Sequence, residues 1–165
     1  MLYHSTRGLA PEIDSAEAVL RGLAPDGGLY LPKEMPVLDW KACVQAPVLE
    51  IARMLLEAFL PDIPEMGKLV EQAYTGKFRA EGLTPLAAAG EMEVLELFHG
   101  PTSAFKDVAL SVLPHLMTAA RRAKGEEKEI LILTATSGDT GKAALEGFKD
   151  VGGIRICVFY PHGGV

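Results

Sequence analysis

The chain has 165 residues, of which 48% are hydrophobic and 23% charged, a composition typical of globular rather than disordered proteins. Its formal net charge of −6 argues against binding along a nucleic-acid backbone, and no apolar run approaches the roughly 18 residues that span a bilayer. The two cysteines and four histidines lack metal-ligand spacing, so neither a metal site nor a disulfide framework is expected. Because no basic segment precedes an apolar stretch at the start, we expect a cytoplasmic protein without membrane contact.

The first ninety residues predict a helical subdomain with short strands. Asp14 can cap the first helix, and Gly22 can end it. Apolar residues recur at helical spacing further along, with Pro47 as an interruption. The expected elements are helices over residues 15–21, 40–60 and 65–74, and a strand over residues 29–31.

The second half of the chain predicts alternating strands and helices. Residues 130–135 are apolar almost throughout, as in a strand buried on both faces. Pro114 should kink the preceding long helix. The expected elements are strands over residues 94–98, 130–135 and 154–160, a helix over residues 104–124, and a second helix that follows the turn at residues 136–141 and ends at residue 148. This order indicates a right-handed parallel unit, and therefore an α/β core with a partial three-layer α/β/α sheet.

Three parallel strands make a thin sheet, whereas parallel sheets are normally covered on both faces. We therefore expect the chain to be part of a longer polypeptide. We also expect a loosely held homodimer that forms through the exposed face of the sheet.

One segment suited to chemistry is the loop over residues 136–141, which reads Thr-Ser-Gly-Asp-Thr-Gly and joins a strand to a helix. Its glycines permit close approach of a ligand, and hydroxyl and N–H groups at a helix start can hold an anion. The loop matches neither the P-loop nor the dinucleotide fingerprint. The alternative is an ordinary turn capped by Ser137 or Asp139.

A second segment is centred on Lys106, in the first turn of a predicted helix. The positive end of the helix dipole disfavours a cation there and favours a neutral amine, as Schiff-base chemistry requires. The alternative is a solvated lysine paired with Asp107. Because both segments follow strands, a parallel sheet would direct them to one crevice at its carboxyl edge.

Residues 97–107, Leu-Phe-His-Gly-Pro-Thr-Ser-Ala-Phe-Lys-Asp, resemble the lysine segment of the threonine synthase family. These are pyridoxal-phosphate enzymes of the tryptophan-synthase-β-like fold, also called fold type II. Residues 134–141 resemble that family's substrate-carboxylate loop, and residues 3–8 and 22–30 are similar as well.

The resemblance implies a domain organisation. Residues 1–90 correspond to the family's extra N-terminal domain, and residues 91–165 to the beginning of its catalytic domain. Family members continue with a serine/glycine-rich loop for the cofactor phosphate and a partner for the pyridine nitrogen, and neither is found in this sequence.

The resemblance also implies residue roles. Lys106 would form the Schiff base with pyridoxal 5′-phosphate and move protons at the substrate's α and β carbons. Phe105 and Asp139 would lie against the cofactor, Asp139 near its phenolic oxygen. The substrate-binding residues would be Thr136, Ser137, Gly138, Asp139 and Thr140. The implied reaction eliminates phosphate from O-phospho-L-homoserine and adds water at the β carbon, giving L-threonine.

Three alternatives remain. A related phospho-lyase would share both motifs and release a keto acid instead. A dehydratase of the same fold is disfavoured, because its loop usually carries Asn where this chain has Asp139. The third is a non-catalytic domain that binds an anion at residues 136–141. For these 165 residues alone we expect weak cofactor binding and no turnover.

Overall fold

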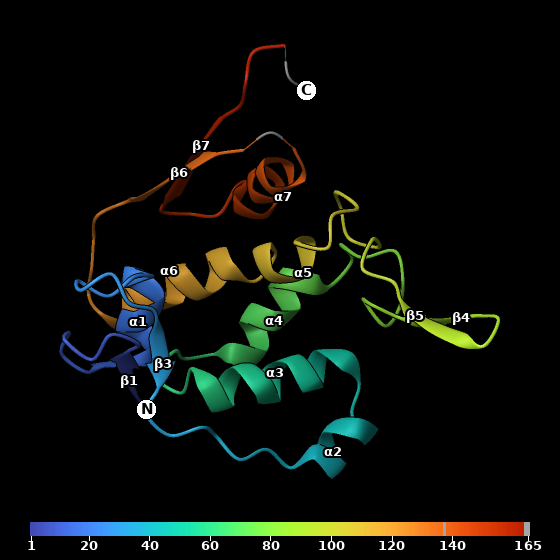
Figure 1. The fold of residues 1–165 in the computed structure, drawn as a ribbon, viewed down its shortest axis with the longest axis horizontal. Coiled ribbons are helices and arrows are strands. Elements are labelled where there is room, and N and C mark those ends of the chain that lie inside the picture. Colours follow the sequence, from blue (N-terminus) through green and yellow to red (C-terminus); the bar gives the residue numbers. More distant parts are fainter. Residues whose placement is uncertain (137, 164–165) are drawn as a thin grey trace. The chain divides into compact units, whose positions relative to one another are not determined.

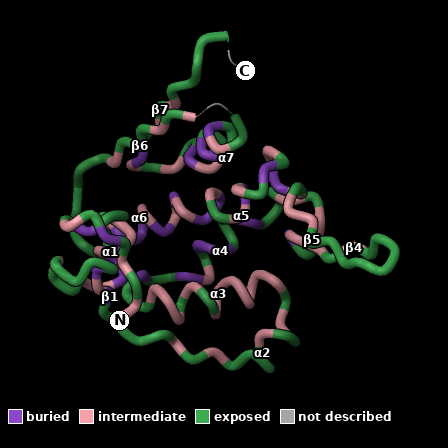
Figure 2. Tube along the Cα trace, viewed as in Figure 1, coloured by how far each residue is buried: buried purple, intermediate pink, exposed green. Residues whose placement is uncertain are grey.

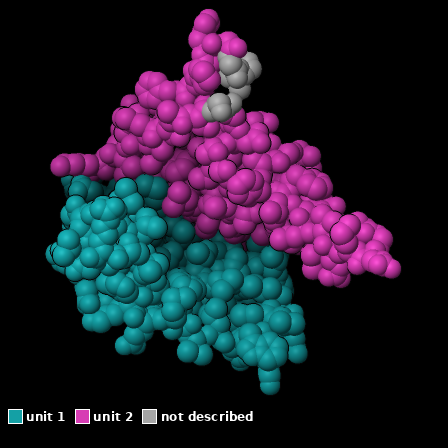
Figure 3. Space-filling view, in the orientation of Figure 1, with its two compact units in different colours: residues 1–70, 116–127 teal, residues 71–115, 128–165 magenta. Residues whose placement is uncertain are grey.

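The computed structural model describes residues 1–136 and 138–163 (Figure 1). The chain divides into two compact units, which are described separately (Figure 3). Unit 1 comprises Met1–Val70 and Leu116–Glu127, and unit 2 comprises Glu71–His115 and Lys128–Val165. Within the described residues, no helix is long and apolar enough to cross a membrane, and no group of three or more His, Cys, Asp or Glu side chains is arranged to hold a metal ion.

Unit 1 begins with a small antiparallel sheet in the order β2-β1-β3. Its strands are β1 (Leu2–Ser5), β2 (Ile13–Asp14) and β3 (Tyr30–Pro32). Helix α1 (Ser15–Arg21) follows β2, and the Asp14 side chain accepts a hydrogen bond from the backbone N–H of Glu17 at 2.9 Å. Gly22 ends the helix with φ +68°. The predicted cap, helix and strand are confirmed.

Pro47 divides the next predicted helix, because its ring cannot continue the helical hydrogen-bond pattern. The result is α2 (Trp40–Gln45), capped by Asp39, and α3 (Val48–Phe59). The Tyr3 hydroxyl donates to the carbonyl oxygen of Phe59 at 2.5 Å, which ties β1 to the end of α3. Helix α4 (Met66–Tyr74) is also confirmed.

The helix predicted over residues 104–124 is in fact two helices, α5 (Asp107–Leu110) and α6 (Leu113–Ala123). Pro114 lies in the first turn of α6, where its missing N–H costs little. In a continuous helix its ring would clash with the carbonyl oxygen of Leu110, four residues earlier. The predicted kink is therefore a break.

Unit 2 contains two separate pairs of strands. Strands β4 (Leu86–Ala89) and β5 (Met92–Leu95) form an antiparallel hairpin, and β6 (Ile130–Ala135) and β7 (Ile154–Phe159) pair in parallel. The prediction of a parallel strand over residues 94–98 is wrong. The turn at Gly90, with φ +65°, lets the apolar residues on either side pair locally, which closes a far shorter loop than pairing with β6 would.

The parallel pair β6–β7 is covered on one face only, by helix α7 (Asp139–Phe148) (Figures 1 and 2). The exposed fractions of Leu131 and Leu133 on β6 are 59% and 62%, and Phe159 on β7 is 59% exposed. Exposure alternates along both strands. The prediction of a β6 strand buried on both faces is wrong for this chain, although the α/β class is confirmed.

We expect low pH to destabilise unit 1, because acid protonates the side chain of Asp62. Its Oδ2 accepts from the backbone N–H and hydroxyl of Ser15 at 3.2 and 2.7 Å, and from the amino group of Met1 at 3.1 Å. Burial raises the pKa of Asp62, but these bonds outweigh burial and hold the pKa below its ordinary value of 3.8. The Asp62 carboxylate contributes its full stabilisation at pH values above its unfolded-state pKa. This contribution is lost as the pH falls through the folded-state pKa.

We therefore expect Asp62→Asn to lower the free energy of unfolding at pH 7, with a difference from the wild type that shrinks below about pH 4. Urea unfolding at several pH values measures this difference. Glu71→Gln, which changes an exposed carboxylate on α4, is the control. A difference that stays constant from pH 7 to pH 3 would contradict the assignment.

Candidate active site

Lys106 immediately precedes α5 and is half-buried. Its Nζ lies 4.0 Å from the centre of the Phe105 ring. Among the described residues, Lys106 makes no ion pair. The carboxylate of Asp107 is instead 1% exposed and accepts from Thr102, at 2.8 Å from the backbone N–H and 2.6 Å from the hydroxyl. The alternative of a lysine paired with Asp107 is therefore wrong.

The loop before Lys106 is tightly built around Asp107. A Cβ on Gly100 would lie 2.5 Å from the Asp107 Oδ2, so only glycine fits there. Sequence reasoning did not identify Gly100, Thr102 or Asp107 as parts of the site. The available signal was an acidic residue at the start of an otherwise apolar helix, which needs a polar partner once it is buried.

The loop over residues 136–140 connects the carboxyl end of β6 to α7. Gly138 is the N-cap residue of α7, and no side chain caps this helix among the described residues. Capping by Asp139 is therefore wrong, and Ser137 lies outside the described residues. The N–H of Gly138 donates to the Thr136 hydroxyl at 3.4 Å. Thr140 lies in the first turn of α7, whose N–H groups and dipole favour an anion.

The two glycines of this loop have different surroundings. A Cβ on Gly141 would lie 2.5 Å from the Thr136 Cγ2 and 3.0 Å from the Val158 Cγ1, so glycine allows α7 to start close to β7. A Cβ on Gly138 would meet no atom within 4 Å. Gly141 therefore serves packing, whereas the space beside Gly138 is open to a ligand.

The lysine segment and the loop are each followed by a helix, α5 and α7, and these two helices pack on each other. The two segments do not share a sheet edge as predicted, because β5 is not part of the parallel sheet. Instead α5 packs directly on α7, where a Cβ on Gly147 would lie 2.2 Å from the carbonyl oxygen of Leu110. Lys142 of α7 also reaches the carbonyl oxygen of Thr102 at 3.5 Å.

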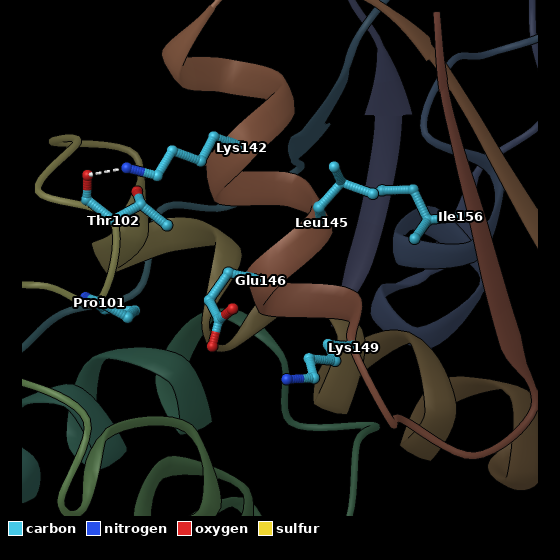
Figure 4. Close-up of a pocket in the computed structure, with 7 residues that line it drawn as sticks. All are labelled: Pro101, Thr102, Lys142, Leu145, Glu146, Lys149 and Ile156. Carbon is cyan, nitrogen blue, oxygen red and sulfur yellow. Dashed lines mark hydrogen bonds between the residues drawn. The ribbon is translucent and has the colours of Figure 1, made fainter.

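A cavity of about 460 Å³ opens beside this contact (Figure 4). Lys142 and Thr102 lie on one side of it, and Leu145 and Ile156 on the other. Lys106 and the described residues of the 136–140 segment do not line it. The described residues that line it are Pro101, Thr102, Lys142, Leu145, Glu146, Lys149 and Ile156.

Comparisons with known proteins give matches for the N-terminal part of the chain and for nearly its whole length. Residues 2–74 match the family model described as "Threonine synthase N terminus". The chain is 41% identical to human Threonine synthase-like 1 over 91% of its own length and 22% of that protein. It is 39% identical to threonine synthase of Pseudomonas aeruginosa, over 98% of this chain and 35% of the relative.

Solved structures give the same result. The PLP-bound threonine synthase of Brucella melitensis is 41% identical, with a TM-score of 0.91 over 100% of this chain and 36% of that one. The yeast threonine synthase is 34% identical, with a TM-score of 0.86 over 98% of this chain and 36% of that one. The chain therefore spans about a third of these relatives, and about a fifth of Threonine synthase-like 1.

Proposed function

This chain is related to the threonine synthases over nearly its whole length, and on that premise we propose that it carries the lysine-bearing part of an enzyme that makes L-threonine. The proposed reaction converts O-phospho-L-homoserine and water to L-threonine and phosphate. The observation that carries the proposal is the amine of Lys106, which has no carboxylate partner among the described residues and lies beside Phe105.

The residues of the site fit pyridoxal 5′-phosphate. An amine with no counterion among the described residues suits a reaction with the cofactor's aldehyde, and the start of α7, which no described side chain caps, suits an anionic substrate. We propose that Lys106, Phe105 and Asp139 hold the cofactor. When bound, the cofactor supplies an electron sink for charge that develops at the substrate's α carbon.

The chain's own residues have two tasks in this proposal. Thr136, Ser137, Gly138, Asp139 and Thr140 hold the substrate carboxylate at the start of α7, which fixes the α carbon. Lys106 accepts and returns protons at the α and β carbons, while the phosphate leaves the γ carbon and water adds at the β carbon. Binding and proton transfer are thus divided between two segments, and the packing of α5 on α7, the helices that follow them, supports this proposal.

The division into residues 1–90, an N-terminal domain, and residues 91–165, the beginning of a catalytic domain, is part of the proposal. The match of residues 2–74 to the N-terminal family model supports it. We further propose a cytoplasmic location, which fractionation of cells that express the tagged chain tests.

The test uses the chain itself. It is incubated with pyridoxal 5′-phosphate, reduced with borohydride and digested, and the modified lysine is located by mass spectrometry. Selective modification of Lys106 is expected, whereas modification scattered over surface lysines would contradict the proposal. We expect no threonine from O-phospho-L-homoserine with the 165-residue chain alone, because the site needs groups for the cofactor phosphate and pyridine nitrogen as well.

Product analysis separates threonine synthase from the related phospho-lyase. A longer protein that contains this sequence should release threonine and phosphate in equal amounts. A keto acid in place of threonine would instead favour the phospho-lyase.

We also propose that two copies associate through the exposed face of the β6–β7 sheet. Leu131, Leu133 and Phe159 are more than half exposed on this face, and burial of such apolar surface drives association. Leu133→Lys is expected to shift the chain from dimer to monomer in sedimentation velocity. A wild-type chain that stays monomeric at about 100 μM, where even weak interfaces associate, would contradict this proposal.

A further inference from the structure

We propose that Thr102 and Asp107 form a positioning pair that fixes the loop carrying Lys106. Neither residue was assigned a role in binding or catalysis. The inference rests on the proposed function, since it takes Lys106 as the reactive amine.

The pair closes the loop by two bonds to one carboxylate. The backbone N–H of Thr102 donates to Oδ2 of Asp107 at 2.8 Å, and its hydroxyl donates to Oδ1 at 2.6 Å. The same hydroxyl oxygen accepts from the N–H of Ala104 at 3.4 Å. The carbonyl of Thr102 accepts from Lys142 at 3.5 Å, so every polar group of Thr102 has a partner.

The loop does not adopt this conformation by local preference alone. Ser103 has φ +62°, a left-handed conformation that is strained for a residue other than glycine. Gly100 must be glycine because Asp107 occupies the space of a Cβ. The position of Asp107 thus imposes the steric requirement at Gly100, in a loop that also contains the strained Ser103.

A role in stability alone does not explain the pair. Burial of a carboxylate costs solvation free energy, and the donors that meet it here are neutral. An apolar side chain at residue 107 would avoid that cost, as replacements of buried charges in other proteins show. What the carboxylate adds is fixed geometry over residues 102–107, and Lys106 lies inside that segment beside Phe105.

The test compares Thr102→Val, which keeps the side-chain shape but removes the hydroxyl, with Thr102→Ser, which keeps the hydroxyl. Trace acetylation without cofactor gives the reactivity of Lys106 relative to Lys149, an exposed lysine in the same molecule. Borohydride trapping with pyridoxal 5′-phosphate gives the selectivity for Lys106. Thermal melting reports global stability separately.

Loss of the hydroxyl should release Lys106 from its half-buried position. We expect Thr102→Val to raise the Lys106 to Lys149 acetylation ratio about threefold and to lower selective trapping about fivefold, well below the melting temperature. Thr102→Ser should stay within about twofold of the wild type in both.

The proposal is overturned if Thr102→Val lowers the melting temperature but leaves both ratios unchanged, because the pair would then only stabilise the fold. If Thr102→Val does not fold, Asp107→Asn, which keeps the side-chain shape and removes the charge, is read by the same criteria. A wild-type chain that shows no preference of the cofactor for Lys106 counts against the proposed function instead, and the acetylation ratio still decides the role of the pair.

Discussion

Replacement of Lys106 by alanine is expected to reduce selective capture of pyridoxal 5′-phosphate roughly twentyfold or more, because Lys106 is the only lysine among the proposed site residues 105, 106 and 136–140. The amine has no carboxylate partner among the described residues, and its one described contact is with the Phe105 ring. Borohydride reduction followed by peptide mapping measures the loss. Fold and stability should change little, since the alanine side chain fits where the lysine stem lies.

The matched control is Lys149→Ala, which removes an exposed lysine of α7's C-terminal end in the same unit. It should leave capture at Lys106 within about twofold of the wild type. Lys106→Arg keeps the positive charge but lacks the reactive amine, so it should behave as Lys106→Ala. Strong capture in Lys106→Arg would mean that another lysine forms the imine and that residue 106 contributes only its positive charge.

Part of the fold can be predicted from the sequence, because some residues determine the backbone structure of their immediate neighbours. Caps such as Asp14 and Asp39, and breaks such as Pro47, act within a few residues of their own position, so their effects appear directly in the sequence. Pairing of strands is different. Strand β5 has an apolar pattern suited to either partner, and only the turn at Gly90 decides for the hairpin with β4.

The candidate site also has features that can be predicted from the sequence and features that cannot. That Lys106 and residues 136–140 are segments with unusual chemistry follows from residue types and spacing. That Asp107 bonds to Thr102 and not to Lys106 does not follow from the sequence, because the loop contains Ser103 in the left-handed conformation, which has no sequence signal at a serine. The link between the two segments is also hidden, since it rests on the contact between Gly147 and Leu110, residues far apart in the chain.

Replacement of Gly147 by alanine should therefore destabilise unit 2 severely. The added Cβ would lie 2.2 Å from the carbonyl oxygen and 2.8 Å from the carbonyl carbon of Leu110, both backbone atoms that cannot rotate away. In a continuous helix, the N–H of residue 114 would donate to the carbonyl oxygen of Leu110. Pro114 has no N–H, so it cannot make this hydrogen bond. Overpacking of this kind costs about 3 kcal/mol or more, even though alanine is the better helix former by about 1 kcal/mol.

The matched control is Gly67→Ala, in helix α4, where the Cβ would meet only the flexible Arg53 Cδ at 3.3 Å. At residue 67 the added Cβ clashes with no backbone atom, so the higher helix propensity of alanine should raise the stability slightly. Urea unfolding of both variants measures the contrast. If Gly147→Ala were as stable as the wild type, α5 would be free to move off α7, and helix packing would no longer account for how α5, which follows Lys106, is held against α7. A severe loss that also abolishes capture at Lys106 would tie the contact to the site as well as to the fold.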